Sequence, residues 1–237
     1  MLAIKDLTVV YPDKTRAVDG ISLLVGEGES VALIGANGAG KTSLIMAIVG
    51  VLPASGEIAV DGVRLSKDTL RSVRQRAGVV FQNPDDQLFM PTVFEDVAFG
   101  PRNLGMENAD ERARRWLRTL NIGHLSEKSA SRLSGGEKRM AALGTVLAME
   151  PKLMLFDEPS AFLDPKARRA LIATLNGLKH TKLIATHDMA FALETCERTV
   201  LLKDGRVFAD GPTKEIVFDE KLMDDCGVEA IRAYGKE

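Results

Sequence analysis

The chain has 237 residues, of which 45% are hydrophobic and 27% are charged, and its formal net charge is −2. This length and composition are typical of a globular protein with a substantial core. The charge lacks the basic excess of nucleic-acid-binding proteins, so we expect no nucleic-acid partner. Two cysteines, Cys196 and Cys226, lack metal-site spacing, and we expect reduced thiols. The chain has no signal-peptide region and no apolar run of about 18 residues, so any membrane role must depend on a partner.

Short aliphatic runs predict the strands of a buried sheet. They cover residues 30–35, 77–81, 152–156, 182–186 and 199–202. Helical patterns follow three of these runs, at residues 41–52, 164–178 and 189–197. Because a helix that connects two parallel strands packs on the face of their sheet, this alternation predicts an α/β fold with a parallel core sheet.

Two Asp-Gly pairs between extended runs predict β-hairpins, at Asp61-Gly62 and Asp204-Gly205. With the N-terminal strands, both hairpins are expected to form a small antiparallel sheet that flanks the parallel core. Residues 83–150 contain no convincing buried strand, whereas residues 107–122 and 134–149 have helical patterns. We therefore expect an inserted α-helical subdomain there.

The segment GANGAGKTS fits the phosphate-binding pattern G-x-x-x-x-G-K-[ST] and lies between a predicted strand and a predicted helix. Its glycines let the backbone turn N–H groups toward phosphate oxygens, and the next helix presents its positive dipole end. Lys41 would reach the β- and γ-phosphates, and the Thr42 hydroxyl would bind Mg²⁺. A purely structural glycine turn does not explain the Lys-Thr pair. The residues expected to bind nucleotide here are Gly35, Ala36, Asn37, Gly38, Ala39, Gly40, Lys41, Thr42 and Ser43.

Two adjacent carboxylates, Asp157 and Glu158, end the apolar run KLMLF. Ligands of open α/β sheets bind at this carboxyl edge of the strands. Asp157 is expected to hold Mg²⁺, and Glu158 is expected to polarise the water that attacks the γ-phosphate. The alternative is a strand-ending turn, which leaves the coincidence with the phosphate-binding loop unexplained.

Further motifs in the chain resemble those of the ATP-binding cassette (ABC) ATPases, in the order that the family has them. LSGGE, residues 133–137, is similar to the family signature, and DEPSAFLD, residues 157–164, is similar to its catalytic glutamate and D-loop. The residues that match other family positions are Gln82 (Q-loop), His187 (switch histidine) and Tyr11 (adenine stacking). The resemblance implies that Gln82 reaches Mg²⁺ and the attacking water, and that His187 contacts the γ-phosphate. Structural roles for His187 and Tyr11 remain alternatives.

The resemblance also implies a head-to-tail dimer, which we expect to be a homodimer. Each ATP would lie between Gly35–Thr42 of one chain and Ser134, Gly135 and Gly136 of the other. Two residues depart from the family pattern. Glu137 places a carboxylate where glutamine is commoner, and Phe162 places bulk in the D-loop near the dimer seam.

Within that family, QNPDDQLFMPTVFEDVAFGPRNLG, residues 82–105, most resembles energy-coupling-factor importers of cobalt or nickel. This implies a site at the cytoplasmic face of the membrane, below a transmembrane coupling protein and a substrate-binding membrane component. Leu88, Phe89, Met90 and Phe94 are expected to be exposed to the coupling protein, with packing inside the helical subdomain as the alternative. An importer of a vitamin or another solute is a second hypothesis. A soluble ABC ATPase acting on DNA or ribosomes is a third, which the single cassette without a long coiled coil disfavours.

We expect one ABC ATPase domain over residues 1–237. Residues 1–82 and 151–215 would form the nucleotide-binding core with its antiparallel β-subdomain. Residues 83–150 would form the helical subdomain, and residues 216–237 a short C-terminal tail.

Overall fold

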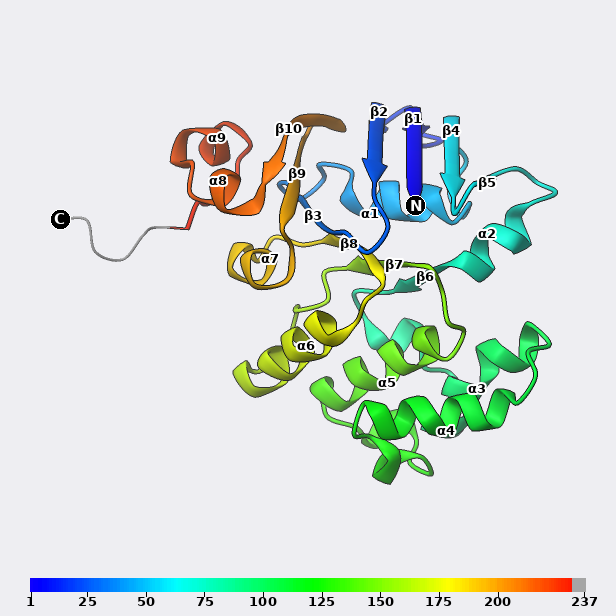
Figure 1. The fold of residues 1–237 in the computed structure, drawn as a ribbon. Coiled ribbons are helices and arrows are strands. Elements are labelled where there is room, and N and C mark those ends of the chain that lie inside the picture. The colour runs from blue at the N-terminus through cyan, green and yellow to red at the C-terminus, as the bar shows by residue number, and fades with distance from the viewer. Residues whose placement is uncertain (232–237) are drawn as a thin grey trace.

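The computed structural model describes residues 1–231 of the chain, and Figure 1 shows its elements. The strands are β1 (Leu2–Val10), β2 (Arg16–Val25), β3 (Ser30–Ile34), β4 (Ser55–Val60), β5 (Val63–Arg64), β6 (Ala77–Val80), β7 (Leu153–Asp157), β8 (Thr181–Ala185), β9 (Arg198–Lys203) and β10 (Arg206–Pro212). The α-helices are α1 (Lys41–Ile48), α2 (Leu70–Arg76), α3 (Val93–Asn103), α4 (Ala109–Thr119), α5 (Gly135–Leu147), α6 (Pro165–Gly177), α7 (Met189–Thr195), α8 (Thr213–Val217) and α9 (Glu220–Asp225). Each aliphatic run predicted as a buried strand overlaps one of the strands β3, β6, β7, β8 and β9.

The larger sheet has six strands in the order β10-β9-β3-β8-β7-β6. The strands from β9 to β6 pair in parallel, and β7 and β8 are buried along their whole length. Continuously buried strands are typical of a parallel sheet that is covered on both faces. The topology confirms the predicted α/β class with a parallel core.

The smaller sheet is antiparallel, with four strands in the order β2-β1-β4-β5. The Asp61-Gly62 hairpin joins β4 and β5 of this sheet, as predicted. The prediction for Asp204-Gly205 is wrong in its choice of sheet, because that hairpin joins β9 to β10 at the edge of the larger sheet. The reason is that β9, an apolar strand, pairs in parallel with β3, so its hairpin partner must extend the same sheet.

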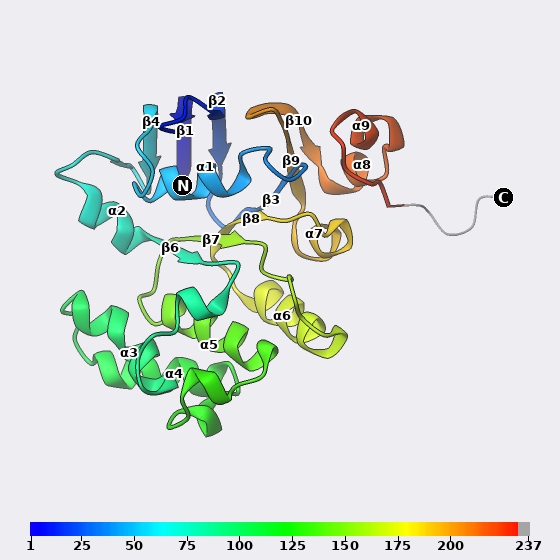
Figure 2. The same cartoon turned by 180° about the vertical axis from the view of Figure 1, so that it is seen from behind.

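Helix α1 lies between the two sheets, as Figures 1 and 2 both show. Its side chains Leu44, Ile45 and Ile48 are fully buried in a core cluster that includes residues of both sheets. Burial of such side chains stabilises the fold by roughly 1.5–3 kcal/mol each. The apolar packing of α1 therefore fixes the position of the loop that precedes it.

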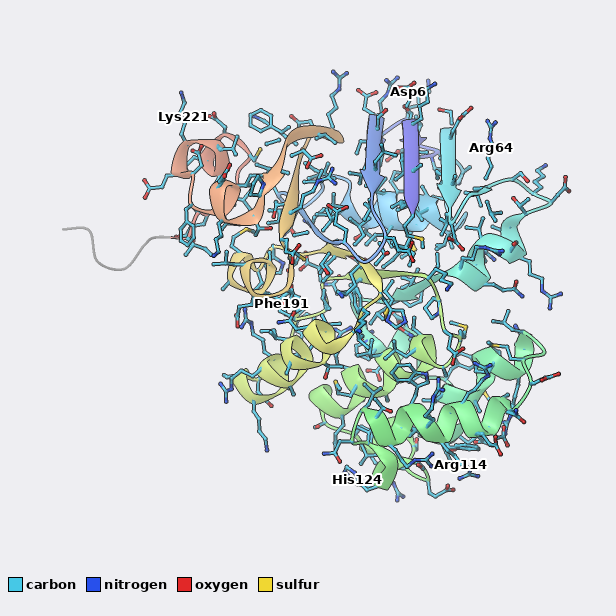
Figure 3. The ribbon with its side chains drawn as sticks, in the orientation of Figure 1. Asp6, Arg64, Arg114, His124, Phe191 and Lys221 are labelled. Carbon is cyan, nitrogen blue, oxygen red and sulfur yellow. The ribbon has the colours of Figure 1, made fainter. Side chains whose placement is uncertain are left out.

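Helices α3, α4 and α5 form a helical layer on the other side of the larger sheet (Figure 1). In Figure 3, Arg114 and His124 mark the far end of this layer, and Asp6 and Arg64 mark the antiparallel sheet at the opposite end of the molecule. Helices α4 and α5 lie within the predicted helical segments, whereas α3 was not predicted as a helix. Its start has a recognisable signal, because Thr92 caps the N–H of Glu95 at 3.2 Å in a T-x-x-E pattern.

The segment expected as a C-terminal tail contains helix α9, and residues 232–237 lie outside the described part. Met223 of α9 is fully buried, and Cys226 is 4% exposed in the same core cluster. Cys196 and Cys226 are both free, in line with the expectation of reduced thiols, and both are buried. Part of the tail segment therefore contributes to the core beside β10.

Candidate nucleotide site

The glycine-rich loop connects the end of β3 to the start of α1. Gly40 has φ of +101°, and a Cβ there would overlap the carbonyl oxygen of Ala17. A Cβ on Gly35 would lie 2.6 Å from the carbonyl oxygen of Leu202. Both positions therefore require glycine, one for its conformation and both for the close approach of neighbouring backbone.

Lys41 is the first residue of α1 and only 7% exposed. Its Nζ donates hydrogen bonds to the carbonyl oxygens of Gly35 (2.7 Å) and Ala36 (3.2 Å). Burial lowers the pKa of Lys41, and the nearby carboxylates of Glu158 and Asp157 act in the opposite direction. The Lys41 ammonium thus lies against the glycine-rich loop, where a bound phosphate would contact both.

The acidic pair lies at the carboxyl end of β7, beside the glycine-rich loop. The Thr42 hydroxyl donates a hydrogen bond to Asp157 Oδ1 at 3.0 Å, although 115 residues separate the two in sequence. Asp157 is 4% exposed, and burial raises its pKa, against the hydrogen bond from Thr42. The structure therefore brings together two of the three residues assigned to Mg²⁺, which belong to separate motifs.

Glu158 is held in an unusual backbone conformation, with φ of +45°. Its N–H donates to the carbonyl oxygen of Ala185 (2.8 Å) at the end of β8. Its carboxylate is 2.8 Å from His187 Nδ1 and 3.9 Å from Lys41 Nζ. Non-glycine residues in this region of φ cost stability and concentrate at functional sites. The neighbouring strands β7 and β8 thus fix Glu158 beside His187.

A cleft of about 500 Å³ joins most of the predicted nucleotide residues. Among the predicted residues, those that line it are Tyr11, Asn37, Gly38, Gly40, Lys41, Thr42, Ser43, Gln82, Glu158 and His187. The Tyr11 hydroxyl is 2.9 Å from Ser43 Oγ, which holds the ring at the cleft. Thr15, Arg16 and Ala17 also line the cleft. The sequence did not predict these three, because Thr15 lies in the β1–β2 connection, Arg16 and Ala17 begin β2, and none of them belongs to a motif.

The signature residues lie outside the lining of this cleft. Ser134 is the exposed N-cap of α5, and its hydroxyl accepts the N–H of Glu137 at 3.3 Å. Glu137 Oε2 in turn accepts the N–H of Ser134 at 2.7 Å, which completes a capping box. A Cβ on Gly136 would lie 2.7 Å from that of Ala167, so α5 packs closely on α6 here. The signature is thus a helix N-terminus that does not line the cleft of its own chain.

The two residues that depart from the family pattern have different surroundings. The Ser134 N–H and hydroxyl hold the pKa of Glu137 below its usual value, so this carboxylate is a structural part of the helix start. Phe162 is 89% exposed and has φ of +62°. Its carbonyl oxygen would be 3.8 Å from a Cβ on Gly135. The backbone of Phe162 therefore lies next to the signature, and its ring is exposed.

The prediction of four exposed apolar residues after Gln82 is only partly correct. Leu88 is 6% exposed and belongs to the core cluster, and Phe94 is half-buried against that cluster. Phe89 is 64% exposed, and its ring packs edge to face on Phe99 with centroids 5.0 Å apart. Phe99 is itself 42% exposed, so the exposed pair on this face is Phe89 and Phe99. Leu88 turns inward because it follows the tight turn at residues 84–86 toward the core.

Comparisons with known proteins agree with this fold. The family model described as "ABC transporter" matches residues 18–161. The energy-coupling factor transporter ATP-binding protein EcfA of Methanothermobacter thermautotrophicus is 43% identical over 94% of this chain and 74% of its own length. The structure of cbiO1 from Clostridium perfringens, described as part of the ABC transporter complex cbiONQ, has a TM-score of 0.82 and 34% identity, covering 94% of this chain and 93% of cbiO1. A dimeric post-hydrolysis structure of the ATP-binding cassette MJ0796 with ADP and Pi has a TM-score of 0.80 and 27% identity, covering 90% of this chain and 99% of that one.

The glycine-rich loop at the cleft and the parallel core are those of an ATPase of the P-loop class. The chain belongs to the ABC transporter ATPases of the energy-coupling-factor type, and it is an ATP-hydrolysing subunit of such a transporter. Within residues 1–231, none of the helices combines the length and apolar character needed to cross a bilayer.

Proposed function

We propose that this ATPase powers a membrane importer of cobalt or nickel ions, from the cytoplasmic face of the membrane. The observation that carries the proposal is the resemblance of residues 82–105 to the cobalt and nickel importers, together with the likeness to cbiO1 of the cbiONQ complex. The exposed Phe89–Phe99 pair lies within this segment. The segment begins at the nucleotide cleft with Gln82, so it is suited to connect ATP hydrolysis to a membrane partner.

The residues of the cleft have chemistry that fits ATP with Mg²⁺. Backbone N–H groups of the loop and the Lys41 ammonium provide donors for phosphate oxygens. Mg²⁺ prefers one or two protein oxygens plus substrate phosphates to a cage of side chains. The Thr42 hydroxyl and the buried Asp157 carboxylate supply such oxygens 3.0 Å apart, and Gln82 lines the same cleft. This mode of binding needs no cage of side chains. Within residues 1–231, no group of three or more acidic, His or Cys side chains could hold a metal by itself.

Glu158 is placed to act on the attacking water. Its carboxylate is nine-tenths buried, which strengthens its interactions with charge in the cleft. It accepts from the N–H of His187 and lies beside the ring of the same residue. His187 itself has a side chain that is 62% exposed, so the ring is free to move toward a γ-phosphate. Glu158 would then polarise the water and accept its proton, while His187 and Lys41 stabilise the charge on the phosphate.

A second copy of the chain would complete each site. Ser134, Gly135 and Gly136 present donors at an exposed helix N-terminus that its own cleft does not use. In a twofold symmetric dimer the same pair of surfaces meets twice, so two equivalent P-loop–signature sites would form. Tyr11 would stack on the adenine of the nucleotide bound to its own chain.

An uptake assay tests the cargo. The chain is produced together with the membrane proteins encoded beside its gene, in cells that lack other cobalt and nickel importers. We expect accumulation of radioactive Co²⁺ or Ni²⁺ that disappears in the Glu158→Gln variant. Uptake of a labelled vitamin without uptake of either metal would overturn the proposed cargo while leaving the ATPase role intact.

The contact with the membrane partner is tested by charge on the exposed aromatic pair. Phe89→Asp should abolish co-purification with the membrane proteins and leave ATP hydrolysis by the isolated subunit unchanged, because Phe89 is exposed and makes no contribution to the cleft. Phe208→Asp is the matched control, because Phe208 is 44% exposed on β10. Equal co-purification of both variants would contradict this docking surface.

A further inference from the structure

Arg139 of α5 is a buried charge that none of the site roles above uses. It is 1% exposed, and no carboxylate among residues 1–231 lies within ion-pair distance of it. Burial lowers its pKa to about 10. A buried guanidinium without an acidic partner loses hydration, and such a residue is costly unless its hydrogen bonds do something specific.

The hydrogen bonds of Arg139 go to the start of the loop that carries Gln82. Nη1 donates to the carbonyl oxygen of Phe81, and Nη2 donates to the carbonyl oxygen of Gln82, both at 2.6 Å. The planar fork of a guanidinium matches two acceptors in a fixed geometry, which an ammonium cannot do. Among the described residues Nε has no hydrogen-bond partner, so these two carbonyls are the contacts there that hold the charge.

A second side chain, Gln87, holds the same backbone. Gln87 Oε1 accepts the N–H of Phe81 at 3.2 Å, and its Nε2 donates to the carbonyl oxygen of Ala142 (2.9 Å) and to Thr145 Oγ1 (2.7 Å). Three hydrogen bonds therefore hold the backbone at Phe81 and Gln82 to α5: two come directly from Arg139, and the third goes through the side chain of Gln87. By contrast, the Lys138 ammonium bonds to the exposed side chain of Asp85 at 2.6 Å.

We propose that Arg139 is a positioning residue for hydrolysis: it holds the backbone of Gln82 so that the Gln82 side chain points into the nucleotide cleft. The proposal rests on the role of Gln82 in the proposed function. Arg139 lies five residues after Ser134, which is about 7.5 Å along the helix axis. The same short stretch of helix thus sets the positions of Gln82 at one nucleotide and of Ser134 at the other.

A double-mutant cycle on the purified full-length chain tests this. Arg139→Lys keeps the charge but loses the fork, so it should lower kcat by about tenfold to 100-fold, as misplaced catalytic groups do. Binding of a fluorescent ATP analogue to the isolated subunit should change by less than about twofold, because Lys41 and the glycine loop are untouched. In the Gln82→Ala background, the same Arg139→Lys substitution should lower kcat by no more than about twofold.

A merely structural role for Arg139 gives a different pattern. The loss in kcat would then be the same with Gln82 and with Ala at that position, and this additive result would overturn the proposal. An unchanged kcat in Arg139→Lys would overturn it too. If Gln82→Ala by itself leaves kcat unchanged, then the role of Gln82 fails and the proposal fails with it, whereas additivity with an active Gln82 refutes only the part played by Arg139.

Two further variants protect the test against loss of folding. Gln87→Met removes an uncharged side chain that fixes the same backbone, so its effect on kcat should also vanish in the Gln82→Ala background. If Arg139→Lys does not fold, the double-mutant cycle of Gln87→Met with Gln82→Ala tests the proposal by itself. Additive effects on kcat in that cycle would refute the proposal. Lys138→Met is the matched control, because it removes a neighbouring positive charge that does not contact the Gln82 backbone. It should leave kcat within about twofold of the wild type, as expected for an exposed ion pair.

Discussion

The two halves of the proposed ATP site on one chain are held in place in different ways. The P-loop half lies where strands β3, β7 and β8 end, and its polar groups already contact one another across long sequence separations, as in Thr42–Asp157. The signature half is an exposed helix N-terminus, and among residues 1–231 the N–H and hydroxyl of Ser134 bond only to Glu137 of the capping box. The first half is thus preorganised by the fold of one chain. The donors of the second half do not line the cleft of their own chain, and in the proposed dimer they would serve the partner's nucleotide.

The largest expected effect is a loss of ATP hydrolysis that leaves ATP binding and dimer formation intact. Glu158→Gln should lower ATP turnover by roughly 10²–10⁴-fold, because the amide cannot accept the proton of the attacking water. ATP binding should persist, since Lys41 and the glycine loop remain. Size-exclusion chromatography with ATP should therefore show a stable dimer of this variant. Turnover at the wild-type rate would show that Glu158 is not the base.

The next prediction compares the two halves directly. Lys41→Met should weaken ATP binding to the isolated subunit by about tenfold to 100-fold, because it removes a charge-assisted hydrogen bond. Ser134→Ala should leave that binding unchanged and lower turnover by about 10²-fold, as does loss of one donor to developing charge. It should also cost about 1 kcal/mol of folding stability through the lost N-cap. Calorimetric titration and steady-state ATPase assays measure these effects.

Mixing those two variants shows whether the halves meet between chains. In a head-to-tail dimer of one Lys41→Met chain and one Ser134→Ala chain, one site has both substitutions and the other has neither. The mixture should therefore hydrolyse ATP faster than either variant alone. An absence of recovery, with mixed dimers shown to form, would argue that each chain uses its own signature.

The same contrast explains what the sequence could predict. The glycine loop, the acidic pair and the capped signature each depend on a few consecutive residues between a strand and a helix, so a local pattern locates them. The Asp204-Gly205 hairpin was placed in the wrong sheet because its position depends on the pairing of β9 with the distant β3. The contacts of Arg139 with Phe81 and Gln82 span 58 and 57 residues, and no local pattern reports them.

The inward turn of Leu88 has the same kind of cause. An apolar run after a polar loop fits an exposed face or a buried one, and only the packing against α3 and α5 decides between them. The Q-loop was therefore identified by its motif, while its attachment to the signature helix became visible only in three dimensions.

A smaller effect concerns Phe162, which lies beside the signature half. Phe162→Gly should change the free energy of unfolding of the subunit by less than about 1 kcal/mol, because relief of the positive φ and the added freedom of the unfolded chain oppose each other. It should weaken the ATP-bound dimer of the Glu158→Gln variant by about 1.5–3 kcal/mol if the exposed ring is buried on assembly. Sedimentation equilibrium with ATP, with and without the Phe162→Gly substitution, measures the dimer affinity. An unchanged dimer affinity would place the ring outside the seam.

The smallest expected effect is at Glu137, where the charge and the capping role can be separated. Glu137→Gln keeps an S-x-x-Q capping box, so the helix start is preserved, but it removes a negative charge near the proposed partner phosphate. ATP should then promote dimer formation at about twofold lower concentration, and this difference should disappear at high salt. A variant that needs more ATP than the wild type would show that the carboxylate assists closure.

The pH dependence of stability gives an independent measure of the Glu137 carboxylate. Its pKa in the folded chain is lowered below the ordinary value of 4.5, chiefly by the N–H of Ser134. For an acid with a lowered folded pKa, the stabilisation is fully present above the unfolded pKa and is lost as pH falls through the folded one. The difference in Tm between the wild type and Glu137→Gln should therefore be constant above about pH 5 and should shift against the wild type in acid. A difference that is independent of pH down to the acid limit would mean that the carboxylate contributes to the signature half only through the shape of its capping box.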